Sequence, residues 1–178
     1  MTALHESALR APLSHTAPSA LGALATKTVA TSHDVSATVA RVSLGLILFP
    51  HGMQHNFGWF GGYGFAGTLG WMTKTLGFPA PLAVLGLLVE LIAPTLLVVG
   101  FGGRVTALAV FAFMGFAAST HLQNGFFMNW FGSLPSGQEG FEYHLLTLAL
   151  AAVLVLKGMG ALSLDRAWLG RRFTSAAS

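Results

Sequence analysis

The sequence contains no cysteine, and only 8% of its 178 residues are charged. The absence of cysteine excludes disulfides, thiolate catalysis, and cysteine-ligated metals or iron–sulfur clusters. Soluble domains are about 25% charged, whereas this chain is 53% hydrophobic, with a mean hydropathy of +0.66. A soluble fold of this size could not bury so much apolar surface. We therefore predict an integral membrane protein.

Basic residues are also few. The formal net charge is +3, and the nine lysines and arginines are scattered along the chain. Nucleic-acid-binding proteins concentrate basic charge on one face or carry a recognisable module. We therefore expect no nucleic acid partner, and we interpret the basic residues as charges that orient the protein in a lipid bilayer.

Four apolar runs follow a polar N-terminal region, at about 35–57, 81–99, 105–121 and 141–162. Each is close to the roughly 20 residues that a helix needs to cross about 30 Å of hydrocarbon. The runs are continuous rather than alternating, which favours helices over a barrel. We predict an all-α fold, an integral membrane four-helix bundle.

Loop charge predicts the orientation of these helices. Basic residues precede the first run, lie between the second and third, and follow the fourth; the two other connections carry only Lys74. Lysine and arginine favour cytoplasmic loops, so we expect both termini in the cytoplasm and the protein in the cell inner (plasma) membrane. We expect a mobile cytoplasmic tail at 1–36, a membrane domain at 37–165 and a basic cytoplasmic tail at 166–178.

The outer connection at 58–77 has seven glycines among its aromatic residues. Tryptophan and tyrosine favour the headgroup zone of a membrane. This composition predicts a broken or interfacial helical segment lying on the outer surface. The second outer connection, at 123–140, is also aromatic.

Glu90 is the most informative single residue, because it lies near the middle of the second run. An ionisable group at that depth costs about 2.5–3.5 kcal/mol on insertion scales. It should face the interior of the bundle and either pair with another group or stay protonated. Two interpretations remain open: a neutral glutamic acid bonded between helices, or a functional contact with a proton, a quinone or another ligand.

His51, Gln54 and His55 form a second polar group, toward the outer end of the first run. Positions 51 and 55 share one helix face, and we expect His51 at a depth similar to that of Glu90. Histidines at this spacing can ligate a metal, but one such pair is weak support, and we predict no metal site.

The third and fourth helices add His121 and Glu142 at their outer ends. Glu142 and His144 are about 200° apart on a helix, so both cannot point inward. We expect Glu142 to point inward, although an acid at a helix N-terminus is also explained by the helix dipole. All four helices would then contribute polar groups to the outer half of the bundle, forming a pocket that opens outward.

A series of short motifs spans almost the whole membrane region. It comprises Arg41-x-x-x-Gly45, His51-Gly52-x-Gln54, Phe60-Gly61-Gly62, Gly77-Phe78-Pro79, Glu90, His121-x-x-x-Gly125-Phe126-Phe127, Glu142-Tyr143-x-x-Leu146 and Gly158-x-Gly160-x-x-Ser163-Leu164-Asp165. Over residues 41–165 the chain resembles the DoxX family. It departs from the family pattern at Ala93-Pro94, where glycines are usual, and at His55, where a lysine or similar residue is common.

The resemblance implies a function in membrane redox chemistry. Members of the family are similar to the small membrane subunit associated with thiosulfate:quinone oxidoreductase, and others are linked to oxidative-stress complexes. We expect a membrane component of a quinone-linked oxidoreductase, with Glu90 and His51 handling protons or binding the quinone head group. Gln54, His55, His121 and Glu142 would shape the ligand site, and a redox subunit would be the partner.

The alternative is a non-catalytic membrane anchor or a transport subunit for a small solute. No nucleotide motif for flavin or nicotinamide is recognisable. Haem held by His51 or His55 together with His121 is chemically feasible, but we disfavour it.

Overall fold

The computed structural model describes residues 22, 24, 26, 29–30, 33–135 and 137–168. The regular elements in this part of the chain are helices, with no strand. The predicted tails at 1–36 and 166–178 lie mostly outside the described residues. The all-helical fold class is confirmed.

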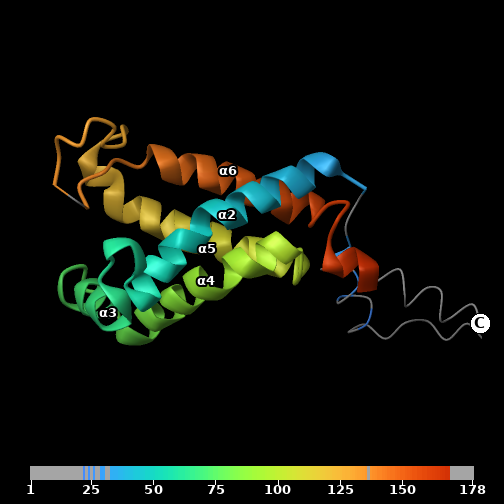
Figure 1. The fold of residues 1–178 in the computed structure, drawn as a ribbon, viewed down its shortest axis with the longest axis horizontal. Coiled ribbons are helices and arrows are strands. Elements are labelled where there is room, and N and C mark those ends of the chain that lie inside the picture. The colour runs from blue at the N-terminus through green and yellow to red at the C-terminus, as the bar shows by residue number, and fades with distance from the viewer. Residues whose placement is uncertain are drawn as a thin grey trace, which may run out of the picture.

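Helices α2 (Val35–Phe57), α4 (Ala80–Val99), α5 (Gly103–His121) and α6 (Glu142–Lys157) pack side by side (Figure 1). Among the described residues, α2, α4 and α5 with its short continuation are long and apolar enough to cross a membrane. The first three predicted runs therefore match helices of membrane-spanning length, and the membrane character of the protein is supported.

The fourth predicted run, 141–162, is helical only over Glu142–Lys157, which at 1.5 Å per residue is about 24 Å. The helix ends at Gly158, which has a φ of 81°, and Gly160 also has a φ of 81°. Residues with a Cβ rarely adopt this left-handed conformation, so the two glycines turn the chain out of the helix. The prediction of a helix to residue 162 was five residues too long.

One end of the helix array, which we call the loop end, carries the long connections (left in Figure 1). It comprises η1 (Trp59–Gly61), α3 (Gly64–Lys74), η2 (Leu122–Asn124) and the residues between η2 and α6. Helix α3 is fixed to α2 because the hydroxyl of the buried Thr68 donates a hydrogen bond to the His55 carbonyl, at 3.2 Å. The predicted broken helical segment is confirmed.

At the opposite end, which we call the terminal end (residues 33–41, 97–104 and 157–168), Arg41 is only 2% exposed. Its guanidinium donates hydrogen bonds to the carbonyls of Met159 (2.7 Å), Leu97 (2.9 Å) and Val98 (2.5 Å), and to that of Leu162. The sequence suggested only an orienting charge. The structure shows that Arg41 joins α2 to the end of α4 and to the turn after α6.

Two acidic residues hold the starts of helices at the terminal end. Asp34 accepts hydrogen bonds from the backbone amides of residues 36 and 37 and pairs with Lys157 at 2.6 Å. This pairing with Lys157 holds the pKa of Asp34 well below its usual range. Asp165 accepts a hydrogen bond from the Gly102 amide beside the start of α5, and burial raises the pKa of its carboxyl. Such carboxylates satisfy amides that have no partner within the helix.

Aliphatic and methionine side chains from α2, α4, α5 and α6 form the main core. The largest buried members are Leu44, Leu48, Leu97, Met114, Leu154 and Met159. Arg41 and Asp165 are buried at the terminal end of this core, whereas Glu90 and His144 are the buried ionisable groups toward the loop end. The core therefore holds the four helices in register beneath a polar region.

Helices α2 and α4 approach each other most closely at two glycines of α2. A Cβ on Gly45 would lie 2.7 Å from the Pro94 carbonyl oxygen, and a Cβ on Gly52 would overlap with the Glu90 carbonyl. Proline has no amide hydrogen, so Pro94 leaves the carbonyl of Glu90 without its usual helical donor. Gly52 lets the backbone of α2 pack directly on that freed carbonyl, as small residues do between membrane helices.

Candidate functional site

The close crossing of α2 and α4 positions the best-defined polar pair in the described residues. Glu90 is 8% exposed, and its Oε2 lies 2.8 Å from Nδ1 of His55 in a hydrogen bond. A carboxyl in an apolar environment needs such a partner to offset its desolvation. The predicted inward position of Glu90 is confirmed, and its partner is His55.

Asn56, next to His55, fixes the position of this pair along the helices. Its Nδ2 donates to the carbonyl of Leu87 in α4 at 3.1 Å and to that of Gly52 in α2 at 3.0 Å. Because Leu87 and Glu90 are three residues apart, they lie on the same face of α4. The Asn56 bridge therefore holds the register in which His55 reaches Glu90.

His51 lies one turn from His55 toward the middle of α2, with 6.5 Å between the ring centroids. Its side chain is exposed, and within the described residues its ring makes no hydrogen bond. The sequence placed Glu90 level with His51, whereas its hydrogen bond goes to His55, one helical turn away. His51 is thus free to contact a ligand.

Helices α5 and α6 contribute a second histidine pair. The ring centroids of His121 and His144 lie 4.5 Å apart. Nδ1 of His121 also lies 2.9 Å from the Ala117 carbonyl, which accepts its hydrogen. His144 is 8% exposed, and its Nδ1 has no hydrogen-bonding partner in the described part of the chain.

The prediction that Glu142 rather than His144 points inward is wrong. His144 shares its face of α6 with the buried Thr147, Ala151 and Leu154, whereas Leu145 and Leu146 are exposed. The prediction took the leucines of α6 to mark its inward face. In a membrane, large apolar side chains are as stable against lipid as in the core, so leucines do not identify the inward face.

Glu142 instead fastens the connection between α5 and α6. Its Oε2 accepts hydrogen bonds from Nε1 of Trp130, at 3.0 Å, and from the Met128 amide, at 3.3 Å. Beside it is an open groove of about 530 Å³, whose lining includes Met128, Trp130, Glu142, Tyr143 and Leu146. Glu142 therefore shapes the wall of the groove.

Gln54 lies against Gly62, where a Cβ would overlap with the Gln54 side chain and carbonyl. Among the described residues its side-chain amide makes no hydrogen bond with the other predicted site residues. Its position supports the turn that follows α2, and the structure does not bring it into contact with Glu90.

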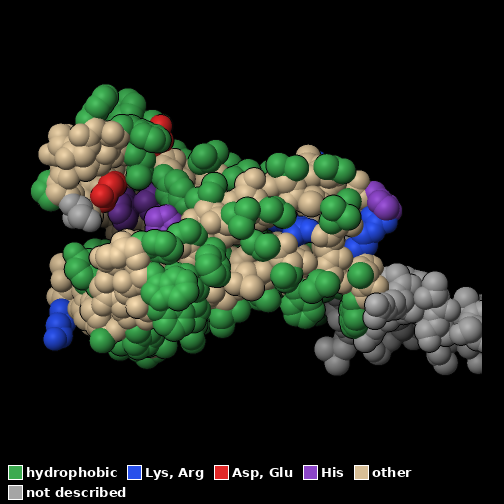
Figure 2. All heavy atoms as spheres, in the orientation of Figure 1, with side chains coloured by type: hydrophobic (Ala, Val, Ile, Leu, Met, Phe, Trp, Pro, Cys, Tyr) green, Lys and Arg blue, Asp and Glu red, His purple; other side chains and the backbone are tan. Residues whose placement is uncertain are grey.

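Tyr143 connects the two histidine pairs. Its ring centroid lies 6.0 Å from that of His51 and 5.8 Å from that of His144. We use the name polar cluster for His51, His55, Glu90, His121, Tyr143 and His144. In Figure 2, histidine side chains lie at the bottom of a notch at the loop end, between the lobe that contains α3 and the lobe formed by the α5–α6 connection. The cluster is therefore reachable from outside.

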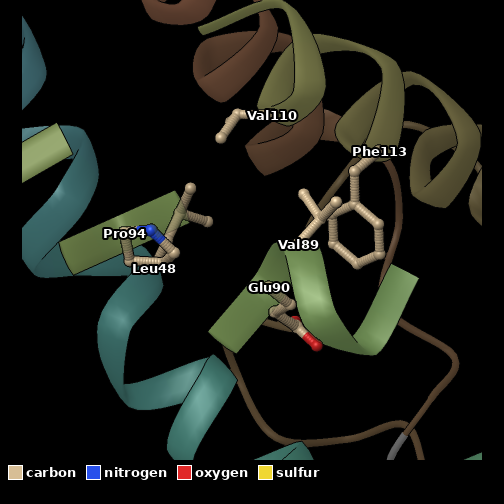
Figure 3. Close-up of a pocket in the computed structure, with 6 residues that line it drawn as sticks. All are labelled: Leu48, Val89, Glu90, Pro94, Val110 and Phe113. Carbon is tan, nitrogen blue, oxygen red and sulfur yellow. The ribbon is translucent and has the colours of Figure 1, made fainter. Parts of the chain in front are cut away.

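A small cavity of about 10 Å³ lies on the core side of Glu90. It is lined by Leu48, Val89, Glu90, Pro94, Val110 and Phe113. Figure 3 shows the Glu90 carboxylate directed away from the apolar side chains around this cavity. The space is about that of one water molecule, so a ring-shaped ligand would have to bind on the notch side.

The chemistry of the polar cluster is that of proton transfer and hydrogen bonding. Carboxyl, imidazole and phenol groups exchange protons and can donate to a carbonyl oxygen. Across the described residues, no group of three or more histidine, aspartate or glutamate side chains could hold a metal ion. Together, the four helices offer several proton-bearing groups to an organic ligand.

Sequence reasoning missed two residues of the polar cluster, Tyr143 and His144, and the structural role of Arg41 at the terminal end. His144 was set aside in favour of Glu142, Tyr143 was noted only within a motif, and Arg41 was taken for an orienting charge. Arg41 lies inside the predicted 35–57 run, and a charge inside a span requires buried partners. That signal could have identified its role.

The family model for DoxX matches residues 36–130, which cover α2, η1, α3, α4, α5 and η2. No curated protein and no solved structure gives a match to the chain. His51, Gln54, His55, Glu90 and His121 fall inside the matched region, whereas Glu142 and the rest of α6 follow it. Because the match covers more than half of the 178 residues, the chain belongs to the DoxX family.

Proposed function

We propose that this protein is the membrane component of a quinone-linked oxidoreductase or oxidative-stress complex, and that a quinone head group binds at the polar cluster. The observation that carries the proposal is the hydrogen bond between the buried Glu90 and the half-buried His55, beside the ring of His51. These groups can donate to a carbonyl oxygen and supply protons within an otherwise apolar helix array.

We also propose that α6 is a fourth membrane span and that the loop end faces outward. Helix α6 packs along α5 and α2, and polar residues at both of its ends can extend the short apolar stretch by reaching the interface. The terminal end carries Arg41, Arg104, Lys157 and Arg166, whereas the described loop end carries only Lys74. This distribution favours cytoplasmic termini and the inner membrane, with the membrane domain at 37–165.

Reduction of a quinone takes two electrons and two protons and yields the quinol. In the proposed reaction the electrons come from a partner redox protein, and the protons reach the two carbonyl oxygens through Glu90, His55 and His51. Oxidation of the quinol by an electron-accepting partner would reverse these transfers. Aromatic side chains near the cluster suit the flat quinone ring.

The other predicted residues have supporting roles in this proposal. His121, stacked on His144, forms the far wall of the site. Glu142 fixes the α5–α6 connection over the cluster through Trp130. Gln54 supports the turn at Gly62 and sets the position of the adjacent loop.

A membrane anchor for a partner protein is a second candidate function. Phe127, Trp130 and Phe131 are 73%, 72% and 95% exposed in the α5–α6 connection. Exposed aromatic side chains are common in interfaces between proteins and at membrane surfaces. The anchor function needs no ligand at the polar cluster, so a measurement of quinone binding separates the two candidate functions.

The direct test is titration of the purified protein, alone and with any partner that copurifies in mild detergent, with a short-chain quinone analogue. Trp59, Trp71 and Trp130 lie at the loop end and should report binding by fluorescence quenching. We expect saturable quenching, weakened at least about tenfold by His51→Ala, since tenfold corresponds to about 1.4 kcal/mol. His33→Ala is the matched control at the terminal end and should bind normally. Absence of saturable binding in folded protein would favour the anchor.

A further inference from the structure

The hydroxyl of Tyr143 is buried and has no hydrogen-bonding partner among the described residues. Buried hydroxyls in folded proteins nearly always have a partner, which can be protein, water or a ligand. Packing alone does not explain this oxygen, because phenylalanine would fill the same space without an unpaired polar atom.

The position of Tyr143 points to the ligand of the polar cluster. Its ring lies between those of His51 and His144, with centroid distances of 6.0 and 5.8 Å. A ligand oxygen that contacts the ring of His51 therefore lies on the same side of the cluster as the phenol.

The open groove of about 530 Å³ begins at this tyrosine. Small-molecule sites have volumes of about 300–1,000 Å³. Tyr143 and Leu146 are three residues apart on one face of α6, and Leu146 is 62% exposed. Tyr143 is the one member of the polar cluster on the groove wall, and Met128, Trp130 and Leu146 supply its apolar surface beside Asn129, Glu139 and Glu142.

We propose that Tyr143 is a ligand-binding residue whose hydroxyl donates a hydrogen bond to a quinone carbonyl, and that the groove along Tyr143 and Leu146 receives the isoprenoid tail. The inference rests on the proposed function and assigns it a further binding residue and a path to the membrane. Met128, Trp130 and Leu146 offer the tail apolar surface within the groove. Because Leu146 is exposed on the surface of α6, a tail that leaves the groove beside it enters the bilayer.

Tyr143→Phe is the decisive variant, because it removes one oxygen atom and keeps the ring that packs against the core. The chain has one other tyrosine, Tyr63, which is 78% exposed at the loop end, so Tyr63→Phe is a matched control. We expect Tyr143→Phe to weaken binding of the short-chain quinone at least fivefold, with thermal unfolding unchanged, and Tyr63→Phe to bind like wild type.

Infrared difference spectra of quinone labelled with ¹³C at one carbonyl or the other identify the bond itself. Loss of a hydrogen bond raises a carbonyl stretching frequency, so Tyr143→Phe should shift one labelled band upward and leave the other in place. Leu146→Phe tests the groove: it should weaken binding of a quinone with a ten-carbon tail more than binding of the same ring without a tail.

The outcomes separate the two proposals. If the wild type binds quinone and Tyr143→Phe binds it with the same affinity and the same carbonyl bands, the assignment of Tyr143 is overturned. The proposed function then still stands. Equal losses for the tailed and tail-less ligands in Leu146→Phe overturn the groove as the tail site. If folded wild-type protein binds neither quinone, the proposed function and this inference both fail.

Discussion

Glu90 has one side-chain hydrogen bond within the described residues, to His55. Such a pair can be a neutral link between helices or a site of proton exchange. The two roles differ in what an amide would do at this position, because glutamine keeps the shape and hydrogen-bonding capacity of glutamic acid and cannot carry the exchangeable proton.

We predict that Glu90→Gln folds and inserts normally and loses quinone-linked turnover in the complex with its partner by at least about tenfold. Glu90→Leu would in addition leave His55 unpartnered and destabilise the protein by about 1–3 kcal/mol. Turnover and thermal unfolding are measured on the same preparations. A fully active Glu90→Gln variant would assign Glu90 a purely structural role.

Arg41 is expected to govern stability and not ligand binding. It is buried among four carbonyls at the terminal end. Arg41→Met leaves these carbonyls without a charged donor, and we predict a loss of about 3–5 kcal/mol in the free energy of unfolding in detergent. Arg41→Lys should recover only part of this loss, because an ammonium cannot form the forked contacts of a guanidinium.

Lys74→Met is the control for this prediction. Lys74 is exposed at the loop end, and its replacement should change stability by less than about 0.5 kcal/mol. Equal effects of Arg41→Met and Lys74→Met would contradict the role of Arg41 in joining α2, α4 and the turn after α6.

At the scale of elements, the packing of α2 on α4 determines whether His55 reaches Glu90. Gly52→Ala places a methyl group against the carbonyl of Glu90, and overpacking of this kind costs about 1–3 kcal/mol. We predict lower stability and weaker quinone binding together, because separating the helices also lengthens the His55–Glu90 contact. Thermal unfolding and quinone titration measure the two effects.

Gly70→Ala in α3 is the matched control, because a Cβ at that position meets nothing within 4 Å. Alanine stabilises a helix relative to glycine by up to about 1 kcal/mol, so this variant should be as stable as wild type or slightly more so. If Gly52→Ala left stability and quinone binding unchanged, the close crossing of α2 and α4 would not be what positions the His55–Glu90 pair.

Much of this element-level arrangement could be predicted from the sequence. The apolar runs matched the bounds of α2 and came within two residues of those of α4 and α5, because lipid requires long continuous helices. The end of α6 could not be predicted in this way, since residues up to 162 stay apolar and the turn depends on Gly158 and Gly160. Hydropathy also cannot tell the core face of α6 from its lipid face, and for that reason His144 was missed.

The polar cluster was partly predictable for a related reason. Glu90, His51 and His55 are rare residue types inside apolar helices, so each could be recognised alone. Which of them pair depends on rotation and register, and these are set by Gly52, Pro94 and Asn56. The function of Tyr143 was not predictable, because an aromatic residue near a helix end is ordinary in a membrane protein.

At the scale of the whole molecule, the proposed topology has four spans with both termini in the cytoplasm. Because the chain has no cysteine, single cysteines can be introduced and tested with an impermeant thiol reagent on intact cells. We predict labelling of Thr75→Cys and Ser133→Cys at the loop end and protection of His33→Cys and Ala167→Cys. Labelling of either terminal-end site would contradict the orientation. If the cysteine at one of positions 33 and 167 were labelled and the other protected, α6 would not be a membrane span.

In the proposed function, a quinone occupies the polar cluster at the loop end. Its most direct test is photocrosslinking of an azido-quinone to the protein in native membranes, followed by mass spectrometric mapping of the labelled peptides. We expect labels in the segments around His51–His55 and Tyr143–Leu146, removed by excess unlabelled quinone and reduced by Tyr143→Phe. Labels confined to the terminal end around Arg41, or labels at the loop end that excess quinone does not remove, would contradict it.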